Sequence, residues 1–419
     1  MENKQIYVAV MFPYPSGAGL HLGHYYNYAI MDSYCRWKRY MGYSVFQPFG
    51  YDAFGLPAEN YARSMGEDPK IVTMRNIEIF RRQMARMNTQ YEEKLITCEP
   101  SYIKWTQWLF KKLFEHNLAY KTNGDVNYCP SCETVLANEQ VRDKKCDRCE
   151  SLVQTKTLEQ WYFRITKYKD RLISNLDKID YPDGTKEQQR HWLENLRDWC
   201  VSRQRKWGCP IPVDGETDTL DTFVDSSFYF LRYLTNSEDE FLPKNQYRQV
   251  DLYVGGAEHA CMHLIYARFI NMFLYDLGIV PEEEPFKKVV HQGMITANGF
   301  KMSKSKGNAI NPDDYNPDEM RLYLMFLGPY THGGDWNDRA ISGVSKLIIK
   351  MKKWLLEIGE DDIDLSFLEK QINKKVDDFK FNTIVSDFMK LYNENKNKKL
   401  KIAVRDKLLK MFRCFAPGM

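Results

Sequence analysis

The sequence predicts an α/β protein in which a parallel sheet carries a cysteine-bearing insert and is followed by a helical bundle. Three observations support this fold class. The first fifty residues alternate strand, glycine-rich turn, helix and strand, which is one right-handed unit of a parallel sheet. Residues 125–155 contain four closely spaced cysteines, and helical periodicity continues from about Ser342 to the last residue. A chain of 419 residues is long enough for two or three domains.

The first strand–helix–strand unit follows from local patterns. Residues Ile6–Phe12 are an apolar run of strand length, and residues 13–19 (PYPSGAG) interrupt it with turn residues. A helix should then run from about His21 to a stop at Gly42. Its large apolar residues recur on one face: Ile30, Tyr34, Trp37 and Met41. Residues Val45–Pro48 then have the composition of a second buried strand.

Further along the chain, residues 70–120 have an amphipathic helical pattern. Residues 220–290 return to an alternation of strand and helix, with short strands expected at Gln249–Val254 and Lys288–His291. Two helices should end the chain, and the polar residues Asn395–Lys399 separate them. The last helices have a basic bias that suits either the phosphates of a nucleic acid or a plain solvated face.

The composition excludes several classes of protein. Hydrophobic residues make up 43% and charged residues 27%, which excludes disordered chains, collagen-like repeats and small disulfide scaffolds. The net charge of +3 confines any basic surface to a local patch. No apolar run is long enough to span a membrane, and the polar first five residues lack the layout of a secretory signal. We therefore expect a cytoplasmic protein with reduced thiols and no membrane partner.

The first motif with chemical meaning is residues 13–24, PYPSGAGLHLGH. Its glycines allow a ligand to approach the backbone closely. His21 and His24 lie in the first turn of a helix, where the helix dipole favours phosphate. The glycine spacing is not that of the dinucleotide fingerprint. Taken alone, the two histidines could equally be polar surface residues.

The second motif is residues 301–308, KMSKSKGN, which follow Gly293 and the pair Asn298-Gly299. Lysines among small hydroxyl residues can clamp a polyphosphate and neutralise the charge that develops in adenylyl transfer. By itself the run is also typical of a solvated charged loop.

Together, in this order and separated by an α/β half, the two motifs resemble the HIGH and KMSKS signatures of class I aminoacyl-tRNA synthetases. Further stretches resemble the leucyl enzymes: residues 11–17 (MFPYPSG), 50–60 (GYDAFGLPAEN), 135–141 (VLANEQV), 221–223 (DTF) and 253–259 (YVGGAEH). The resemblance extends from about residue 5 to 419. Residues 197–199 and 201–204 are shared with the valyl and isoleucyl enzymes and do not discriminate. The pattern of the methionyl enzymes around Asp52 is absent.

The resemblance implies a leucine–tRNA ligase that activates leucine with ATP, releases pyrophosphate and transfers leucine to tRNA(Leu). Asp52 would hold the ammonium group of leucine, assisted by the backbone of Met11 and Phe12, because a buried cation requires a fixed anion. The leucine side chain would be lined by Phe12, Tyr14, Phe223, Tyr253, His259 and His263. The two histidines could instead form a metal pair, although Ala260 stands where the zincin pattern requires glutamate. A packing role for His263 also stays open.

The resemblance also implies an ATP site across the carboxyl ends of the parallel strands. The residues expected to act in catalysis are His21 and His24 at the phosphates, and Lys301 and Lys304 over the pyrophosphate. The residues expected to bind ATP are His21, Gly23, His24, Gly255, Gly256, Glu258, Met294, Lys301, Met302, Ser303 and Lys304. We expect Mg²⁺ to accompany ATP. Positioning and charge stabilisation, rather than acid–base chemistry, should carry the reaction.

The four cysteines form two C-x-x-C pairs, Cys129 with Cys132 and Cys146 with Cys149. This spacing predicts a structural Zn²⁺ site; four unrelated thiols or a redox dithiol are the alternatives. Four cysteine ligands leave no open coordination position, so the metal would not be catalytic. The resemblance places this ribbon near the acceptor end of tRNA.

The chain departs from the leucyl family in its connective region. The two stretches that flank the editing domain in the family, Gln188–Trp192 and Leu196–Trp199, are almost contiguous here. We therefore predict no hydrolytic proofreading, so leucine would be discriminated in the pocket alone, where near-isosteric side chains differ by only ~1–3 kcal/mol. We also expect a short N-terminus and a bundle that stops near its middle.

The resemblance implies the Rossmann-type parallel sheet of the class I synthetases with insertions. It divides the chain into six parts. They are the first half of the Rossmann catalytic domain (1–120), the zinc ribbon (121–158), the remainder of the connective region (159–212), the second half of the catalytic domain (213–298), the KMSKS loop with a stem-contact region (299–345), and a partial anticodon-binding helical bundle (346–419). We expect a monomer. The alternative functions are a catalytic-core paralogue or fragment that serves another acceptor or a regulatory role, and a zinc-ribbon nucleic-acid-binding module without catalysis.

Overall fold

The computed structural model describes residues 4–15, 19–136, 140–146, 149–257, 262–302 and 310–419. At its centre is a parallel four-stranded sheet in the order β14-β13-β1-β2. Its strands are β1 (Gln5–Val10), β2 (Ser44–Phe46), β13 (Leu252–Gly256) and β14 (Val289–Gln292). Because β1 pairs with β13, strands from two distant parts of the chain form one sheet whose carboxyl ends share an edge. The predicted α/β class is confirmed.

The first helix, α1 (Leu22–Tyr40), agrees with the prediction of a helix that starts at His21 and stops near Gly42. The predicted buried strand at Val45–Pro48 is wrong in detail. The chain forms the half-exposed strand β2 and then a separate buried strand, β3 (Pro48–Tyr51), which pairs with a different partner. Pro48 cannot donate a backbone hydrogen bond, and so the pairing changes at this point.

That partner is β4 (Glu92–Ile96), which lies within the segment that sequence periodicity assigned to helix throughout. The helices on either side of it match the prediction: α3 (Pro69–Arg86) and α4 (Pro100–Glu115). A short helix, α2 (Leu56–Met65), precedes them. A five-residue strand leaves too weak a periodic signal to stand out between two long amphipathic helices.

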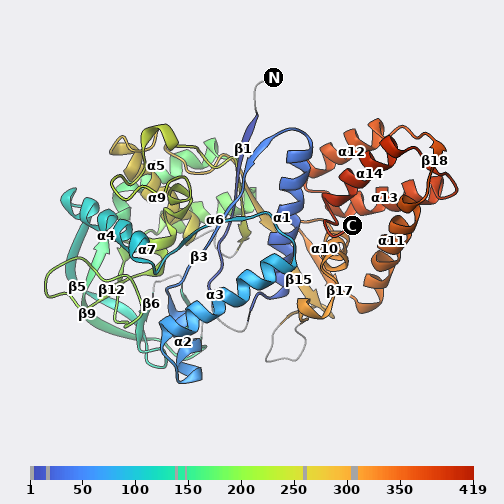
Figure 1. Ribbon diagram of the computed structural model, residues 1–419. Helices are drawn as coiled ribbons and strands as arrows, with labels where there is room; N and C mark the ends of the chain where they lie inside the picture. The colour runs from blue at the N-terminus through green and yellow to red at the C-terminus, as the bar shows by residue number, and fades with distance from the viewer. Residues whose placement is uncertain (1–3, 16–18, 137–139, 147–148, 258–261, 303–309) are drawn as a thin grey trace.

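The insert lies on the opposite side of the central sheet from the C-terminal helices (Figure 1). Its main sheet is antiparallel in the order β10-β9-β5-β6. These strands are β5 (Ala119–Cys129), β6 (Thr134–Leu136), β9 (Gln154–Phe163) and β10 (Trp199–Cys200). The remaining small elements of this region are β7 (Val141–Arg142), β8 (Lys145–Cys146), η2 (Ile165–Tyr168), α5 (Lys169–Ser174), η3 (Asn175–Lys178), α6 (Asp183–Glu194), β11 (Ser202–Arg203) and β12 (Thr219–Leu220).

The second half of the chain returns to the central sheet and then forms a small sheet of its own in the order β16-β15-β17. The helices around β13 and β14 are α7 (Thr222–Ser226), α8 (Tyr229–Arg232), η4 (Lys244–Gln246) and α9 (His263–Asp276). The small sheet consists of β15 (Met294–Ala297), β16 (Phe300–Lys301) and β17 (Gly333–Trp336). The turn between β15 and β16 is Asn298-Gly299, and both residues have the positive φ that a two-residue hairpin requires.

Helices dominate the last part of the chain, as the periodicity predicts, except for the short strand β18 (Ile358–Asp361). The helices are α10 (Pro317–Phe326), α11 (Asp338–Leu356), α12 (Ser366–Asp377), α13 (Phe381–Asn395) and α14 (Ile402–Arg413), preceded by η7 (Pro312–Asp314). They pack against α1 in one apolar core (Figure 1). No helix among the described residues is both long and apolar enough to cross a membrane.

A buried ion pair fastens α1 to the C-terminal helices. Arg321 in α10 donates to Asp32 in α1 at 2.7 Å, and both side chains are almost fully buried. Burial raises the pKa of Asp32, but Arg321 and Arg36 outweigh it and hold this pKa below its usual value. The carboxylate is therefore charged, and the ion pair fastens the middle of α1 to α10, which follows the KMSKS segment.

Candidate active site

The two histidines of the first motif cap α1 reciprocally. His21 is the N-cap residue, and its Nδ1 accepts from the backbone N–H of His24, while Nδ1 of His24 accepts from the backbone N–H of His21. Their rings stack with centroids 3.7 Å apart. Burial, together with the adjacent His21, lowers the pKa of His24 well below its usual value. Because a neutral ring that accepts at Nδ1 carries its proton on Nε2, His24 presents an N–H donor at the positive end of α1.

Asp52 follows β3 directly and is almost completely buried. Its backbone N–H donates to the carbonyl of Pro13, which places it beside the first motif. One carboxylate oxygen accepts from the hydroxyl of Thr222 at 2.9 Å, and the other is buried without a hydrogen-bond partner. Burial, and then the nearby carboxylate of Asp225, raises the pKa of Asp52 well above its usual value. A cation bound beside this carboxyl would lower its pKa and favour the charged form.

Aromatic rings surround the region next to Asp52. Phe12, at the end of β1, stacks on Tyr229 of α8 with centroids 3.9 Å apart and planes 2° apart. The hydroxyl of Tyr229 lies 2.9 Å from that of Tyr253 in β13, which in turn lies 2.7 Å from Nε2 of His263. Phe223 in α7 is buried in the same apolar cluster. Five elements thus contribute to one apolar wall that contains a short chain of polar atoms.

The structure brings together most of the residues predicted for the amino-acid site. Met11 and Tyr14 lie on the segment between β1 and α1, and both are half-buried. Sequence reasoning missed Thr222 and Tyr229, which contact Asp52 and Phe12 directly. Thr222 lies inside the matched stretch 221–223, so a closer look at that stretch would have found it. Tyr229 has no local signal, because it lies in a run of aromatic residues that pattern analysis assigns to the core.

Of the residues predicted to bind ATP, Gly255 and Gly256 end β13, which begins and ends later than the strand predicted at Gln249–Val254. A Cβ atom on Gly255 would lie 2.5 Å from the end of the Met11 side chain, so a larger residue there would displace this flexible side chain. The carbonyl of Gly255 lies 2.9 Å from Nδ1 of His291 in β14. Met294, at the start of β15, is 55% exposed, so its apolar side chain is available to a flat ligand. Gly23 lies in the first turn of α1, and Met302 is half-buried against the core.

Several predicted residues lie outside the described part of the chain: Glu258, His259, Ser303 and Lys304. The backbone of Lys301 belongs to β16, and its side chain is outside the description as well. Helix α9 begins at His263, so the expected i, i+4 pairing of His259 with His263 on one helix face remains a prediction.

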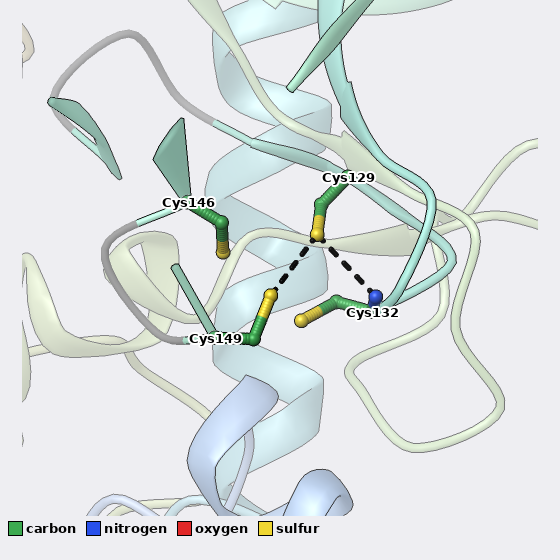
Figure 2. Close-up of side chains that lie close together, drawn as sticks. All are labelled: Cys129, Cys132, Cys146 and Cys149. Atoms are coloured by element: carbon green, nitrogen blue, oxygen red, sulfur yellow. Dashed lines mark hydrogen bonds between the residues drawn. The ribbon is translucent and has the colours of Figure 1, made fainter. Parts of the chain in front are cut away.

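The four cysteines of the insert converge (Figure 2). Cys129 ends β5, Cys146 lies in β8, and their partners Cys132 and Cys149 follow in the adjacent turns. All four sulfur atoms lie within 4.8 Å of one another, and the Cys129 and Cys149 sulfurs are 3.4 Å apart. Sulfur ligands at about 2.3 Å from a tetrahedral Zn²⁺ are themselves about 3.8 Å apart. The donor set and its spacing therefore fit a closed four-thiolate zinc site.

The backbone around the cysteines supports this interpretation. The residue after each C-x-x-C pair, Glu133 and Glu150, has a positive φ of 52° and 59°. The backbone N–H of Cys132 donates to the sulfur of Cys129 at 3.4 Å, and Asn60 of α2 donates to the sulfur of Cys132 at 3.7 Å. N–H donors to sulfur stabilise thiolates, and the contact from Asn60 fixes the cysteine cluster to the segment that follows Asp52.

Comparison with known proteins places these features in one family. Residues 6–346 match the family described as tRNA synthetases class I (M). A leucine–tRNA ligase of Clostridium botulinum (strain Hall) is 32% identical over 657 aligned positions that cover 93% of this chain and 81% of the relative. One of Clostridium tetani is also 32% identical, over 99% of this chain and 85% of the relative.

Two solved structures have the same fold. The LeuRS–tRNA–LeuAMS ternary complex of Agrobacterium radiobacter K84 agnB2 superposes with a TM-score of 0.89 at 25% identity, over 100% of this chain and 84% of that one. Methionyl-tRNA synthetase of Mycobacterium tuberculosis, bound by methionyl-adenylate, gives a TM-score of 0.77 at 19% identity, over 99% of this chain and 92% of that one. The second similarity shows the fold alone.

Proposed function

Because the chain belongs to the class I aminoacyl-tRNA synthetases, we propose that it activates leucine with ATP to leucyl-adenylate and transfers leucine to tRNA(Leu). The observation that carries the amino-acid part is the buried carboxylate oxygen of Asp52 that has no partner. A primary ammonium group is the ligand that would satisfy it, because it supplies both a charge and a donor. The aromatic wall beside Asp52 suits an apolar side chain such as that of leucine.

In the proposed reaction the carboxylate of leucine attacks the α-phosphorus of ATP and pyrophosphate leaves. His21 and His24 would donate Nε2–H groups to the phosphates from the N-terminus of α1. Lys301 and Lys304 would neutralise the leaving pyrophosphate, and Gly255, Gly256 and Glu258 would contact adenosine. Mg²⁺ takes few protein ligands when phosphates are present, so we expect it to arrive with ATP and to neutralise charge. No proton has to be transferred, and so alignment of the reactants supplies most of the rate enhancement.

We further propose that this chain contains no hydrolytic editing site. Helix α6 ends at Glu194 and β10 begins at Trp199, so four residues join them. Asp198 in this connection accepts from the hydroxyls of Tyr120 and Thr166, which fixes the short path in place. The alignment with the relative from Clostridium botulinum has 657 positions against 419 residues here, so at least 238 (657 − 419) of its positions have no counterpart in this chain.

We propose a structural role for Zn²⁺ at Cys129, Cys132, Cys146 and Cys149. When bound, the metal would cross-link β5, β8 and the turns between them, a region too small to have a large apolar core of its own. We also propose the six-part division of the chain, on the basis of its resemblance to the leucyl enzymes. The parts are the two catalytic halves, the ribbon, the connective region, the stem-contact region and the partial bundle.

The experiment that tests the proposed function measures leucine-dependent ATP–pyrophosphate exchange and aminoacylation of tRNA(Leu) with one preparation of the protein. Exchange and charging together would establish the proposed ligase. Exchange without charging would mean that the chain makes the adenylate for another acceptor or a regulatory role. Absence of exchange with leucine, while another amino acid supports it, would refute the assignment of the substrate.

A further inference from the structure

We propose that Gln83 is a positioning residue that ties the first ATP-signature segment to the segment that follows the second signature, through one side-chain amide. The proposal rests on the proposed function, because it concerns the ATP-binding half of the same site. Gln83 lies in α3 and is almost fully buried, at 7% exposure. Its two polar atoms contact two segments that are more than 290 residues apart in sequence, around Leu20 and around Asp313.

The acceptor side of the amide holds the first signature. Oε1 of Gln83 accepts from the backbone N–H of Leu20 at 2.7 Å, in a buried position directly before His21. Gly19 has a φ of +124°, and a Cβ atom there would lie 2.9 Å from the same oxygen. The chain thus adopts a glycine-only conformation so that its backbone can reach this oxygen. The contact fixes the position of Leu20, the residue directly before the helix cap that His21 and His24 form.

The donor side of the amide holds the segment after the second signature. Nε2 of Gln83 donates to Oδ2 of Asp313 at 2.9 Å. Asp313 lies in η7, just beyond residue 310, where the described chain resumes after the KMSKS residues. Its other oxygen accepts from the hydroxyl of Tyr25 at 3.1 Å and from Arg86 at 2.9 Å. Asp313 is therefore held from α1 and α3 together.

Neighbouring residues of α3 extend the same arrangement. Asn76, seven residues before Gln83 and so on the same helix face, donates to the carbonyl of Pro15 at 2.9 Å. Arg86, three residues after Gln83, donates to the carbonyl of Tyr315 at 2.8 Å. Helix α3 runs from α2 towards α1 and β15 (Figure 1), and this one face contacts both the segment before α1 and the segment around Asp313 that follows the second signature. Gln83 is the residue on it that contacts both.

An amide suits this position because it offers an acceptor and a donor in one rigid plane. A shift of either segment has to break one of two hydrogen bonds, and a buried N–H left unpaired is costly. Two pairs of residues are predicted to act on the phosphates. His21 and His24 follow Leu20 in the sequence, and Lys301 and Lys304 precede Asp313. Misplacement of reacting groups by about 1 Å can reduce a rate about a hundredfold. Loss of the Gln83 contacts should therefore impair the use of ATP and leave leucine binding at Asp52 intact.

The test is a double-mutant cycle at pH 8 with Gln83→Glu, Asp313→Asn and the double variant. In Gln83→Glu, the carboxylate still accepts from Leu20 but faces the carboxylate of Asp313. In Asp313→Asn, two amide donors face each other. In the double variant the bond is restored with reversed polarity, since the amide introduced at position 313 donates to the carboxylate introduced at position 83. The amide oxygen at position 313 still accepts from Tyr25 and Arg86. Gln90→Glu is the matched control, because Gln90 is exposed and its Oε1 accepts from Arg39.

The readouts are kcat and KM for ATP and for leucine in the exchange reaction. Each single variant should lose about 10- to 100-fold in kcat/KM for ATP with an unchanged KM for leucine, and the double variant should recover most of it. Three outcomes would overturn the proposal. They are an exchange rate of Gln83→Glu equal to that of the control, a double variant with a kcat/KM for ATP as low as that of the single variants, and an equal rise in the KM values for ATP and leucine.

A second readout separates this proposal from the proposed function. The increase in melting temperature that saturating ATP causes is measured for all five proteins. If the wild-type protein supports no leucine-dependent exchange, the proposed function fails, and the role of Gln83 is judged on this increase. A smaller increase in the single variants that returns in the double variant supports the proposal, and the same increase in all variants overturns it.

Discussion

Replacing Asp52 with asparagine should abolish efficient leucine activation while leaving the folded protein at least as stable as the wild type. Asparagine keeps the acceptor for Thr222, which lies 2.9 Å from Oδ1 of Asp52. It places an amide donor where the unpaired carboxylate oxygen lies. An ammonium group would then meet a donor instead of an acceptor, and the buried cation would lose its counter-charge.

The magnitude follows from the burial of the pair. Truncating one partner of a buried, hydrogen-bonded charge pair costs about 2–5 kcal/mol. Because about 1.4 kcal/mol corresponds to a factor of ten, kcat/KM for leucine should fall roughly 30- to 4,000-fold. The KM for ATP should change by less than about tenfold, since the proposed function assigns Asp52 to leucine and not to ATP.

The stability of the ligand-free protein should respond in the opposite direction. The pKa of Asp52 is raised in the folded state above its ordinary value of 3.8. Above pH 3.8 the unfolded chain releases a proton that the folded chain retains, so stability falls as the pH rises through this window. Asp52→Asn removes this loss, and its melting temperature relative to the wild type should therefore increase between pH 5 and pH 8.

Asp225→Asn is the matched control. Burial raises the pKa of Asp225 to about 8. Like Asp52, it has one carboxylate oxygen that accepts from a threonine hydroxyl, that of Thr106 at 2.8 Å, and one that is buried without a partner, but the proposed function assigns it no ligand. The control should show a similar gain in stability at high pH with kcat/KM for leucine changed by less than about tenfold. Kinetics in the exchange assay and thermal unfolding at the two pH values check both variants. A leucine kcat/KM of Asp52→Asn within tenfold of the wild type would refute the assigned role of Asp52.

Three further predictions concern other parts of the molecule. The purified protein should contain one Zn²⁺ per chain by elemental analysis. Cys129→Ser should lose the metal and melt at a lower temperature, whereas the control Cys98→Ser should retain the metal. Full metal content in Cys129→Ser would contradict the proposed zinc site. Tyr229→Phe keeps the stacking on Phe12 but loses the contact with the Tyr253 hydroxyl, so it should relax discrimination of leucine against isoleucine and methionine in exchange assays by up to about tenfold. The control is Tyr233→Phe, whose buried hydroxyl has no hydrogen-bond partner, and equal selectivity of the two variants would count against this role of Tyr229. Preformed norvalyl-tRNA(Leu) incubated with the protein should be hydrolysed no faster than in buffer alone, and rapid deacylation would show that an editing site exists.

Features that depend on neighbours in sequence could be predicted well. The bounds of helix α1 follow from its apolar periodicity and the glycine after it, and the spacing of the cysteines indicates their convergence in advance. The strand β4 was missed because its residues pair with β3, some forty positions earlier, and carry little periodicity of their own. The change of strand partner at Pro48 was missed for the same reason.

By itself, the sequence determined the α/β class, the two signature motifs, the cysteine cluster and the acid expected to meet the amino group. Only the tertiary structure decided how these parts meet: Thr222 holds Asp52 across 170 positions, Tyr229 stacks on Phe12, and Gln83 reaches Asp313 across 230 positions. A hydrogen bond or a ring contact between distant residues imposes no period on either segment. Such contacts form only once folding has brought the two segments together, because each contact needs a partner atom whose position the local sequence does not determine.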